Sequence, residues 1–318
     1  MSGQRVHNAR ISSPHQNGQI NPGGVNGCCH GWTAGVQPNQ RRVLRNPRVM
    51  LIFWGHYYET SADATAFATQ LVNDLVTGPF MNNLCQYGVG RGSIIGTATF
   101  DTGQLDPAPG TIDESGIKSR LRQWITSASA IPAPAVNEGS LVYFIFPPTT
   151  TELTLNGLKG DVDFCGYHNW DKYNAQSSDD DLFFGIVSTK AVAAANTNAG
   201  AFVRALSPCV GHELAESFTD RDGAGYISSE CTNPDHSTQT CEIGDICEQH
   251  SFQYQRPGSV QTWNVEQYWS GWDNSCINGN APVSIKKFLN AISFDYHHLG
   301  LRSLGTSDIN LQYVASRM

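Results

Sequence analysis

Residues 211–220 restrict the possible folds of this chain more than any other segment. They read Gly-His-Glu-Leu-Ala-Glu-Ser-Phe-Thr-Asp, so a histidine and three carboxylates stand in an otherwise apolar stretch. An α-helix turns about 100° per residue, which places His212, Glu216 and Asp220 near one face, with Glu213 beside them. Like charges gathered in an apolar setting repel one another and lose hydration unless a cation holds them. The segment therefore predicts a helix that binds a metal ion.

The same segment resembles the His-Glu-x-x-His helix of zincins, in which the two histidines bind zinc and the glutamate activates water. Glu216 stands in the place of the second histidine. By this resemblance His212 and Glu216 are metal ligands, and Glu213 is the general base. Because a glutamate ligand carries more negative charge than a histidine, the metal should be a weaker Lewis acid. Low or specialised activity would follow.

A zinc site of this type needs a third protein ligand from outside the helix or from just beyond its end. Residues 241–247 hold two carboxylates between cysteines, and residues 164–168 present a histidine on a segment loosened by glycine. The candidates for the third ligand are Glu242, Asp245, His168, Asp220 and Asp222. For His168 three roles stay open: metal ligand, transition-state donor and structural residue.

Simpler interpretations of these residues exist. His212 fits a hydrogen-bonded histidine of the core, and Glu213 and Glu216 fit solvent-facing charges, the usual position of a glutamate on a helix. Glu242 and Asp245 fit a solvated loop or a calcium-binding loop. An all-carboxylate site would favour calcium as a structural ion, whereas one or two histidine ligands favour zinc as the cofactor.

Nine cysteines are many for a cytosolic enzyme of 318 residues. They favour disulfide bonds formed in an oxidising compartment, and hence a secreted, extracellular protein. A bridge from Cys241 or Cys247 is expected to secure the loop that carries Glu242 and Asp245, because that region has few apolar side chains. The first 48 residues contain no apolar run typical of a signal peptide. The chain is therefore a mature form, is exported by another route, or keeps its thiols reduced.

Charge and hydropathy exclude several classes of partner. The formal net charge is −8, and the 20 basic residues are dispersed along the sequence. This distribution argues against a nucleic-acid-binding surface and a polybasic membrane anchor. No segment approaches the roughly 20 apolar residues of a membrane-spanning helix. The zincin-like helix instead predicts a peptide or protein as the substrate.

Apolar runs and helical periodicities alternate along the chain. Buried strands are predicted at residues 49–54, 93–100, 141–146 and 182–187, and amphipathic helices at 61–76 and 113–127. Ser207 and Pro208 favour an active-site helix near 208–219, with Pro208 inside a longer helix as the alternative. The expected fold class is α/β, a zincin-like mixed sheet with packed helices and a loop-rich, disulfide-containing C-terminal part. The expected domains are an irregular arm (1–47), a zincin-like domain (48–282) and a C-terminal extension (283–318).

Several segments taken in order resemble the plant EXORDIUM/phosphate-induced protein 1 family and its microbial relatives. The resemblance is carried by residues 49–58, 165–168, 212–216, 219–220 and 242–247, and by Tyr268-Trp269-Ser270 followed by Asn274 and Cys276. It covers roughly residues 48–280. It implies an extracellular protein with a zincin-like helix, and the plant members of the family are known for growth signalling.

Two functions are therefore expected. The first is a zinc-dependent peptidase in which His212 and Glu216 bind the metal and Glu213 is the general base. The second is a non-catalytic extracellular signalling or binding protein, in which the same residues hold a structural cation. An open coordination position near Glu213 favours the enzyme, and a closed coordination shell favours the structural role.

Overall fold

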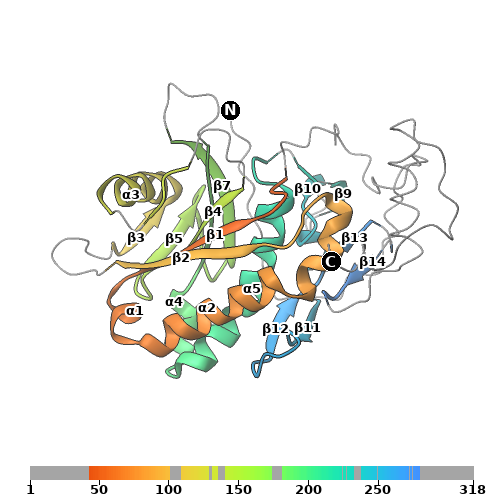
Figure 1. Cartoon of the computed structure of the whole chain (residues 1–318). Coiled ribbons are helices and arrows are strands. Elements are labelled where there is room, and N and C mark those ends of the chain that lie inside the picture. Colours follow the sequence, from red (N-terminus) through yellow and green to blue (C-terminus); the bar gives the residue numbers. More distant parts are fainter. Residues whose placement is uncertain are drawn as a thin grey trace, which may run out of the picture.

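A five-stranded mixed sheet lies at the centre of the molecule (Figure 1). The computed structural model describes residues 43–100, 109–128, 131–134, 140–173, 181–223, 225–226, 228–232, 238–248, 250–271, 273 and 275–279. The strands of the sheet are β1 (Arg48–Trp54), β2 (Ser93–Phe100), β4 (Leu141–Phe146), β7 (Gly166–Lys172) and β8 (Asp181–Val187). Their spatial order is β2-β1-β4-β8-β7, with all neighbours parallel except the antiparallel edge strand β7. The predicted α/β class, mixed sheet and packed helices are confirmed.

The central strands are apolar on both faces because the sheet separates two cores. Along β1, Val49, Leu51 and Phe53 enter one core, whereas the alternate residues Met50 and Ile52 enter the other. β4 and β8 alternate in the same way. Side chains of a strand point to opposite faces with a period of two, so a continuous apolar run is what two covered faces require.

Helices cover both faces of the sheet (Figure 1). One core contains side chains of α2 (Ala62–Thr77) and α5 (Ala199–Thr219), and the other contains those of α3 (Glu114–Ser127). The α2 N-terminus is capped by Ser61, whose side chain accepts a hydrogen bond from Ala64 N. Two short helices, α1 (His56–Thr60) and α4 (Lys190–Ala195), pack against the same core as α2 and α5.

Helix α5 is longer than the segment 208–219 predicted from the Ser-Pro pair. It begins at Ala199, with the Asn198 side chain as its N-cap, and Pro208 lies inside it. Proline has no N–H to donate to the carbonyl four residues earlier, which here belongs to Arg204. The Ser207 hydroxyl lies 2.7 Å from that carbonyl oxygen and supplies a donor. The preferred helix start was therefore wrong, and the alternative of Pro208 in a longer helix is correct.

The region after α5 is built from short strands and turns, as expected for a loop-rich part. Its elements are β9 (Ser228–Thr232), β10 (Thr238–Cys241), the 3-10 helix η2 (Asp245–Cys247), β11 (Ser251–Tyr254), β12 (Trp263–Glu266), β13 (Tyr268–Ser270) and β14 (Ser275–Ile277). The strands pair in sequence as three antiparallel hairpins. Elsewhere lie the 3-10 helix η1 (Pro79–Tyr87) and a small sheet of β3 (Thr111–Asp113), β5 (Glu152–Leu155) and β6 (Leu158–Lys159). Val265 and Trp263 of β12 join the core on the α5 side.

The chain termini fall mostly outside the described residues. Of the predicted arm 1–47 only residues 43–47 are described, and the predicted extension 283–318 lies outside. Leu44 is fully buried and donates its N–H to the carbonyl oxygen of Phe218, near the end of α5 (2.8 Å). Among the described residues, no helix combines the length and apolarity needed to cross a membrane.

Candidate metal centre

The carboxylates of the α5 segment are buried. Glu213, Glu216 and Asp220 are each 0% exposed, and Glu242, from the loop before η2, is 1% exposed. The interpretation of Glu213 and Glu216 as solvent-facing helix charges is therefore wrong. Burying an ionised carboxylate is costly unless hydrogen bonds or opposite charges compensate, so the neighbours of these groups decide what they do.

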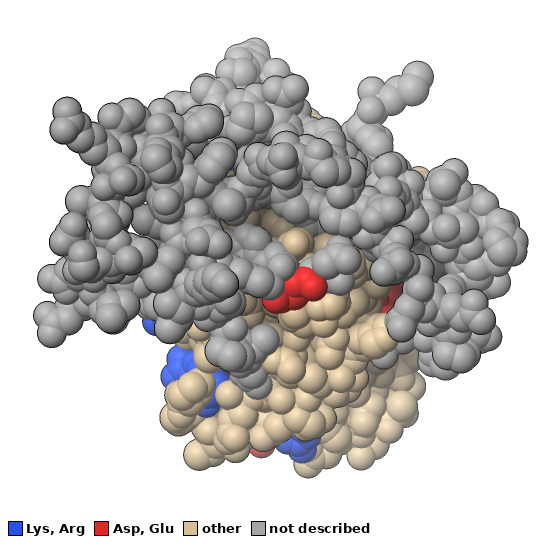
Figure 2. Space-filling view, turned by 90° about the vertical axis from the view of Figure 1, so that its right-hand side faces the viewer, with Lys and Arg blue, Asp and Glu red and all other residues tan. Residues whose placement is uncertain are grey.

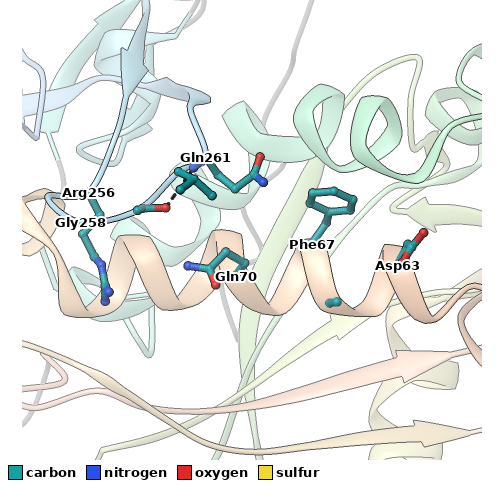
Figure 3. A pocket seen from close by; sticks show the side chains of 9 residues that line it. Asp63, Phe67, Gln70, Arg256, Gly258 and Gln261 are labelled. Atoms are coloured by element: carbon teal, nitrogen blue, oxygen red, sulfur yellow. Dashed lines mark hydrogen bonds between the residues drawn. The ribbon is translucent and has the colours of Figure 1, made fainter.

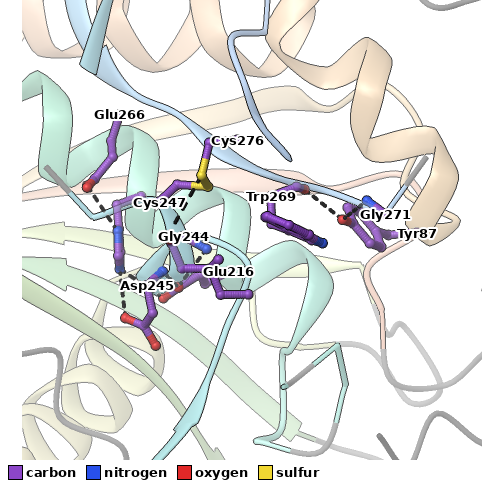
Figure 4. Close-up of a disulfide and its surroundings, with 11 residues drawn as sticks. Tyr87, Glu216, Gly244, Asp245, Cys247, Glu266, Trp269, Gly271 and Cys276 are labelled. Carbon is purple, nitrogen blue, oxygen red and sulfur yellow. Dashed lines mark hydrogen bonds and ion pairs between the residues drawn. A yellow bond between two sulfur atoms is a disulfide. The ribbon is translucent and has the colours of Figure 1, made fainter. Parts of the chain in front are cut away.

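Three of the predicted site residues converge on one point: His212, Glu216 and Asp245. Glu216 and Asp245 are labelled in Figure 4. Nε2 of His212 lies 3.2 Å from Oε2 of Glu216 and 3.6 Å from Oδ1 of Asp245. Zinc holds nitrogen and oxygen ligands at about 2.0–2.2 Å in a tetrahedron, so neighbouring ligand atoms stand about 3.3–3.6 Å apart. The two spacings are compatible with neighbouring ligands of one metal ion, and all three ligand atoms lie within 4.8 Å of one another.

The close contact between the loop and the helix depends on Gly244. The backbone N–H groups of Gly244 and Asp245 both donate to Oε1 of Glu216, at 3.1 and 3.2 Å. This leaves Oε2 of Glu216 directed at His212. A Cβ atom on residue 244 would stand 2.7 Å from Glu216 Oε1 and 2.8 Å from His212 Nδ1, closer than side chains normally approach. The absence of a side chain at residue 244 thus lets the loop backbone approach the side chains of Glu216 and His212 closely.

His168 joins Glu213 and Glu216 in a second group. It lies on the edge strand β7, with Nδ1 at 3.6 Å from Glu213 Oε2 and 3.8 Å from Glu216 Oε2. Its Nε2 atom is 3.4 Å from Glu242 Oε2 and 3.1 Å from the backbone carbonyl of Asp220. His168 therefore faces Glu213, the predicted general base, while Asp245 lies with His212.

The remaining predicted ligands have other neighbours. The Asp220 carboxylate accepts a hydrogen bond from Gly225 N, and Glu242 lies against His168. Neither residue, nor Asp222, belongs to the groups of ligand atoms that converge among the described residues. Of the candidates for a third ligand, Asp245 is the one that lies with both His212 and Glu216.

The clustered charges shift the pKa values of the histidines. Burial lowers the pKa of His212, but Glu216 and Glu266 outweigh this effect and raise it well above its usual value. Burial also lowers the pKa of His168, which Glu213 and Glu216 reverse to a net rise. For Glu242, burial and then the neighbouring carboxylates raise the pKa well above normal. These shifts indicate that the carboxylates of the site carry more negative charge than its two histidines can neutralise.

Glu266 is a neighbour of this site that the sequence reasoning missed. Its Oε2 atom lies 3.1 Å from Nδ1 of His212. Glu266 is the last residue of β12 and stands 54 positions after His212. No local spacing links the two, so only the packing of β12 on α5 reveals the contact.

Two disulfides hold the elements that carry these residues. Cys247, which ends η2, is bridged to Cys276 of β14, and this confirms the predicted staple on the loop of Asp245 (Figure 4). Cys165 is bridged to Cys209 and joins the start of β7 to α5. Each cysteine of the second bridge stands three residues before a site histidine, His168 or His212. The bridge therefore fixes the two histidine-bearing elements against each other.

The described surface also has a groove outside the predicted site. A groove of about 460 Å³ lies between α2 and residues 256–261, and none of its lining residues belongs to the predicted site (Figure 3). On the face in Figure 2, the described basic side chains lie in separate small patches at the lower left and the bottom. Neither a protein-family model nor a curated protein matches the chain. The resemblance to the EXORDIUM family stays a prediction carried by its motifs.

Proposed function

We propose that the chain is a zinc-dependent hydrolase that cleaves peptide bonds, with the metal held by His212, Glu216 and Asp245. The observation that carries the proposal is the convergence of His212 Nε2 with Glu216 Oε2 and Asp245 Oδ1 at 3.2 and 3.6 Å. These three residues come from a helix and a separate disulfide-bonded loop. Three protein ligands leave a fourth tetrahedral position for water or substrate, the arrangement of catalytic zinc sites.

The donor atoms favour zinc over calcium. The group at His212 offers one imidazole nitrogen and two carboxylate oxygens. Calcium takes six to eight oxygen ligands and seldom a nitrogen, whereas imidazole nitrogen suits zinc.

Glu213 is assigned the role of general base. It is fully buried one residue from His212, and within the described part of the chain neither of its carboxylate oxygens accepts a hydrogen bond. A bound zinc ion would lower the pKa of water and polarise the carbonyl of the scissile bond. Glu213 accepts the proton of the attacking water and delivers it to the leaving amine as the C–N bond breaks.

His168 is assigned to the same reaction as a hydrogen-bond donor. Its Nε2 atom is 3.1 Å from the carbonyl oxygen of Asp220, which can only accept a hydrogen bond, so Nε2 carries a proton. The raised pKa favours a second proton on Nδ1, which faces Glu213. A protonated His168 can hold the Glu213 carboxylate in place and stabilise negative charge that develops in the transition state.

A second function, a non-catalytic extracellular protein with a structural metal ion, rests on the burial of the site. Glu213 and Glu216 are 0% exposed, and among the proposed ligands Asp245 is the most exposed, with 19% of its side chain accessible against 3% for His212. The two disulfides support an oxidising compartment for either function. The resemblance to the EXORDIUM family supports an extracellular role of the second kind.

Incubation of the zinc-loaded protein with a broad library of peptides distinguishes the two functions. The hydrolase predicts cleavage that stops when a chelator removes the metal and returns when zinc is restored. Zinc binding without any cleavage would reject the hydrolase and leave the structural role. A protein that binds no metal ion would reject both.

A further inference from the structure

Glu266 contacts the ring nitrogen of His212 that does not face the ligand group. Its Oε2 atom is 3.1 Å from Nδ1, whereas Nε2 faces Glu216 and Asp245. Glu266 is 8% exposed. The imidazole is thus held between a carboxylate on one side and the two other proposed ligands on the other.

This contact determines which nitrogen of His212 can bind a metal. An ionised carboxylate only accepts hydrogen bonds, so Nδ1 must carry a proton to bond with Glu266. In the neutral ring the lone pair then stands on Nε2, which is the atom directed at Glu216 and Asp245. The hydrogen bond of one ring nitrogen sets the tautomer and the orientation of the other.

Glu266 is held in place by elements other than the loop of Asp245. It pairs with Ser251 across the hairpin of β11 and β12. This hairpin packs on α5 at Gly211, where a Cβ atom would stand 2.6 Å from Cγ1 of Val265. At its other end, Trp263 Nε1 donates to the buried carboxylate of Asp74 on α2 (3.0 Å). The carboxylate of Glu266 thus sits on a scaffold anchored to two helices.

We propose that Glu266 is a positioning residue of the metal centre, which fixes His212 as the Nδ1–H tautomer with Nε2 directed at the metal. This inference rests on the proposed zinc site and adds a residue outside the predicted motifs. Outer carboxylates of this kind are worth about 10–100-fold in metal affinity.

The first experiment compares zinc affinity by competition with a chromophoric chelator. Glu266→Ala should weaken zinc binding by about 10–100-fold, and Glu266→Gln by less, because an amide oxygen can still accept from Nδ1. Glu59→Gln, a change on the exposed α1 helix, should leave the affinity unchanged. Wild-type affinity in both Glu266 variants, with an unchanged melting temperature, would overturn the proposal.

The second experiment needs no change at Glu266. Nitrogen-15 NMR of histidine-labelled, zinc-loaded protein, with His212 assigned by its loss in His212→Gln, should show a proton on Nδ1 and the metal on Nε2. The opposite tautomer would overturn the proposal even if the Glu266 variants fail to fold. A wild type that binds no zinc would instead reject the metal centre itself, so the two failures are distinguishable.

Discussion

Oε2 of Glu216 lies 3.2 Å from Nε2 of His212, and both side chains are buried on the same face of α5. The contact follows from their four-residue spacing, which brings two side chains over one turn of a helix. The local geometry also separates the two oxygens of Glu216. Oε1 accepts two backbone N–H groups of the η2 loop, which leaves Oε2 for His212. The helix and the loop together make a carboxylate with one oxygen available to a metal.

Gly244→Ala should weaken zinc binding by on the order of tenfold or more without unfolding the protein. The added Cβ would meet Glu216 Oε1 at 2.7 Å and His212 Nδ1 at 2.8 Å, so the loop must move away from both ligands. Gly110→Ala is the matched control, because a Cβ atom there meets nothing within 4 Å. Isothermal titration with zinc measures both. Equal affinities in the two variants would contradict the close packing of the loop on the ligands.

Glu213→Gln should keep the metal and the melting temperature but lower peptide hydrolysis by on the order of 100-fold or more. The amide keeps the shape of the side chain and cannot take the proton of water. Steady-state cleavage assays with metal analysis of the same sample check this. Loss of the metal together with activity would make Glu213 a ligand.

Removing the Cys247–Cys276 bridge by Cys247→Ser with Cys276→Ser should lower the free energy of unfolding by about 2–4 kcal/mol. The bridge restricts the unfolded chain and ties η2 to β14, so zinc affinity should fall as well. Cys85→Ser, at an exposed position, should change stability by less than about 0.5 kcal/mol. Denaturant unfolding gives these values, and a double variant as stable as the control would show that the staple is not needed.

Zinc binding at neutral pH should release protons, and zinc affinity should rise with pH. In the metal-free protein, Glu216 and Glu266 overcome the effect of burial and raise the pKa of His212 well above its usual value. This shift favours the ring protonated on both nitrogens in the metal-free protein, so zinc must displace the proton on Nε2. As pH rises through this raised pKa the competing proton is lost. Calorimetric titration in buffers of different ionisation enthalpy counts the released protons, and a count of zero would contradict the protonated state.

The sequence predicts the parts of this fold that depend on local pattern. The apolar run of β1 and the helical periodicity of α2 are read directly from neighbouring residues, and both elements are confirmed. The start of α5 was placed wrongly because proline usually marks a first turn. The Ser207 hydroxyl, which replaces the donor missing at Pro208, is a three-dimensional compensation that residue preferences do not encode.

The same limit applies to the site. His212 and Glu216 are predictable because their contact lies within one helical turn. Asp245 was one of five candidates, and only the fold distinguishes it from Glu242, which lies three residues earlier and faces His168. No sequence pattern marks Glu266 as a site residue, because its contact with His212 depends on the pairing of β12 with β11 and the packing of β12 on α5.

The most direct test of the metal centre is the zinc content of the purified protein and its dependence on His212. Wild type should carry about one zinc ion per chain by elemental analysis, and His212→Ala should carry far less, because it removes the nitrogen on which Glu216 and Asp245 converge. His56→Ala, which changes a histidine with 70% of its side chain exposed, should keep the wild-type content. Stoichiometric zinc in His212→Ala would contradict the assignment.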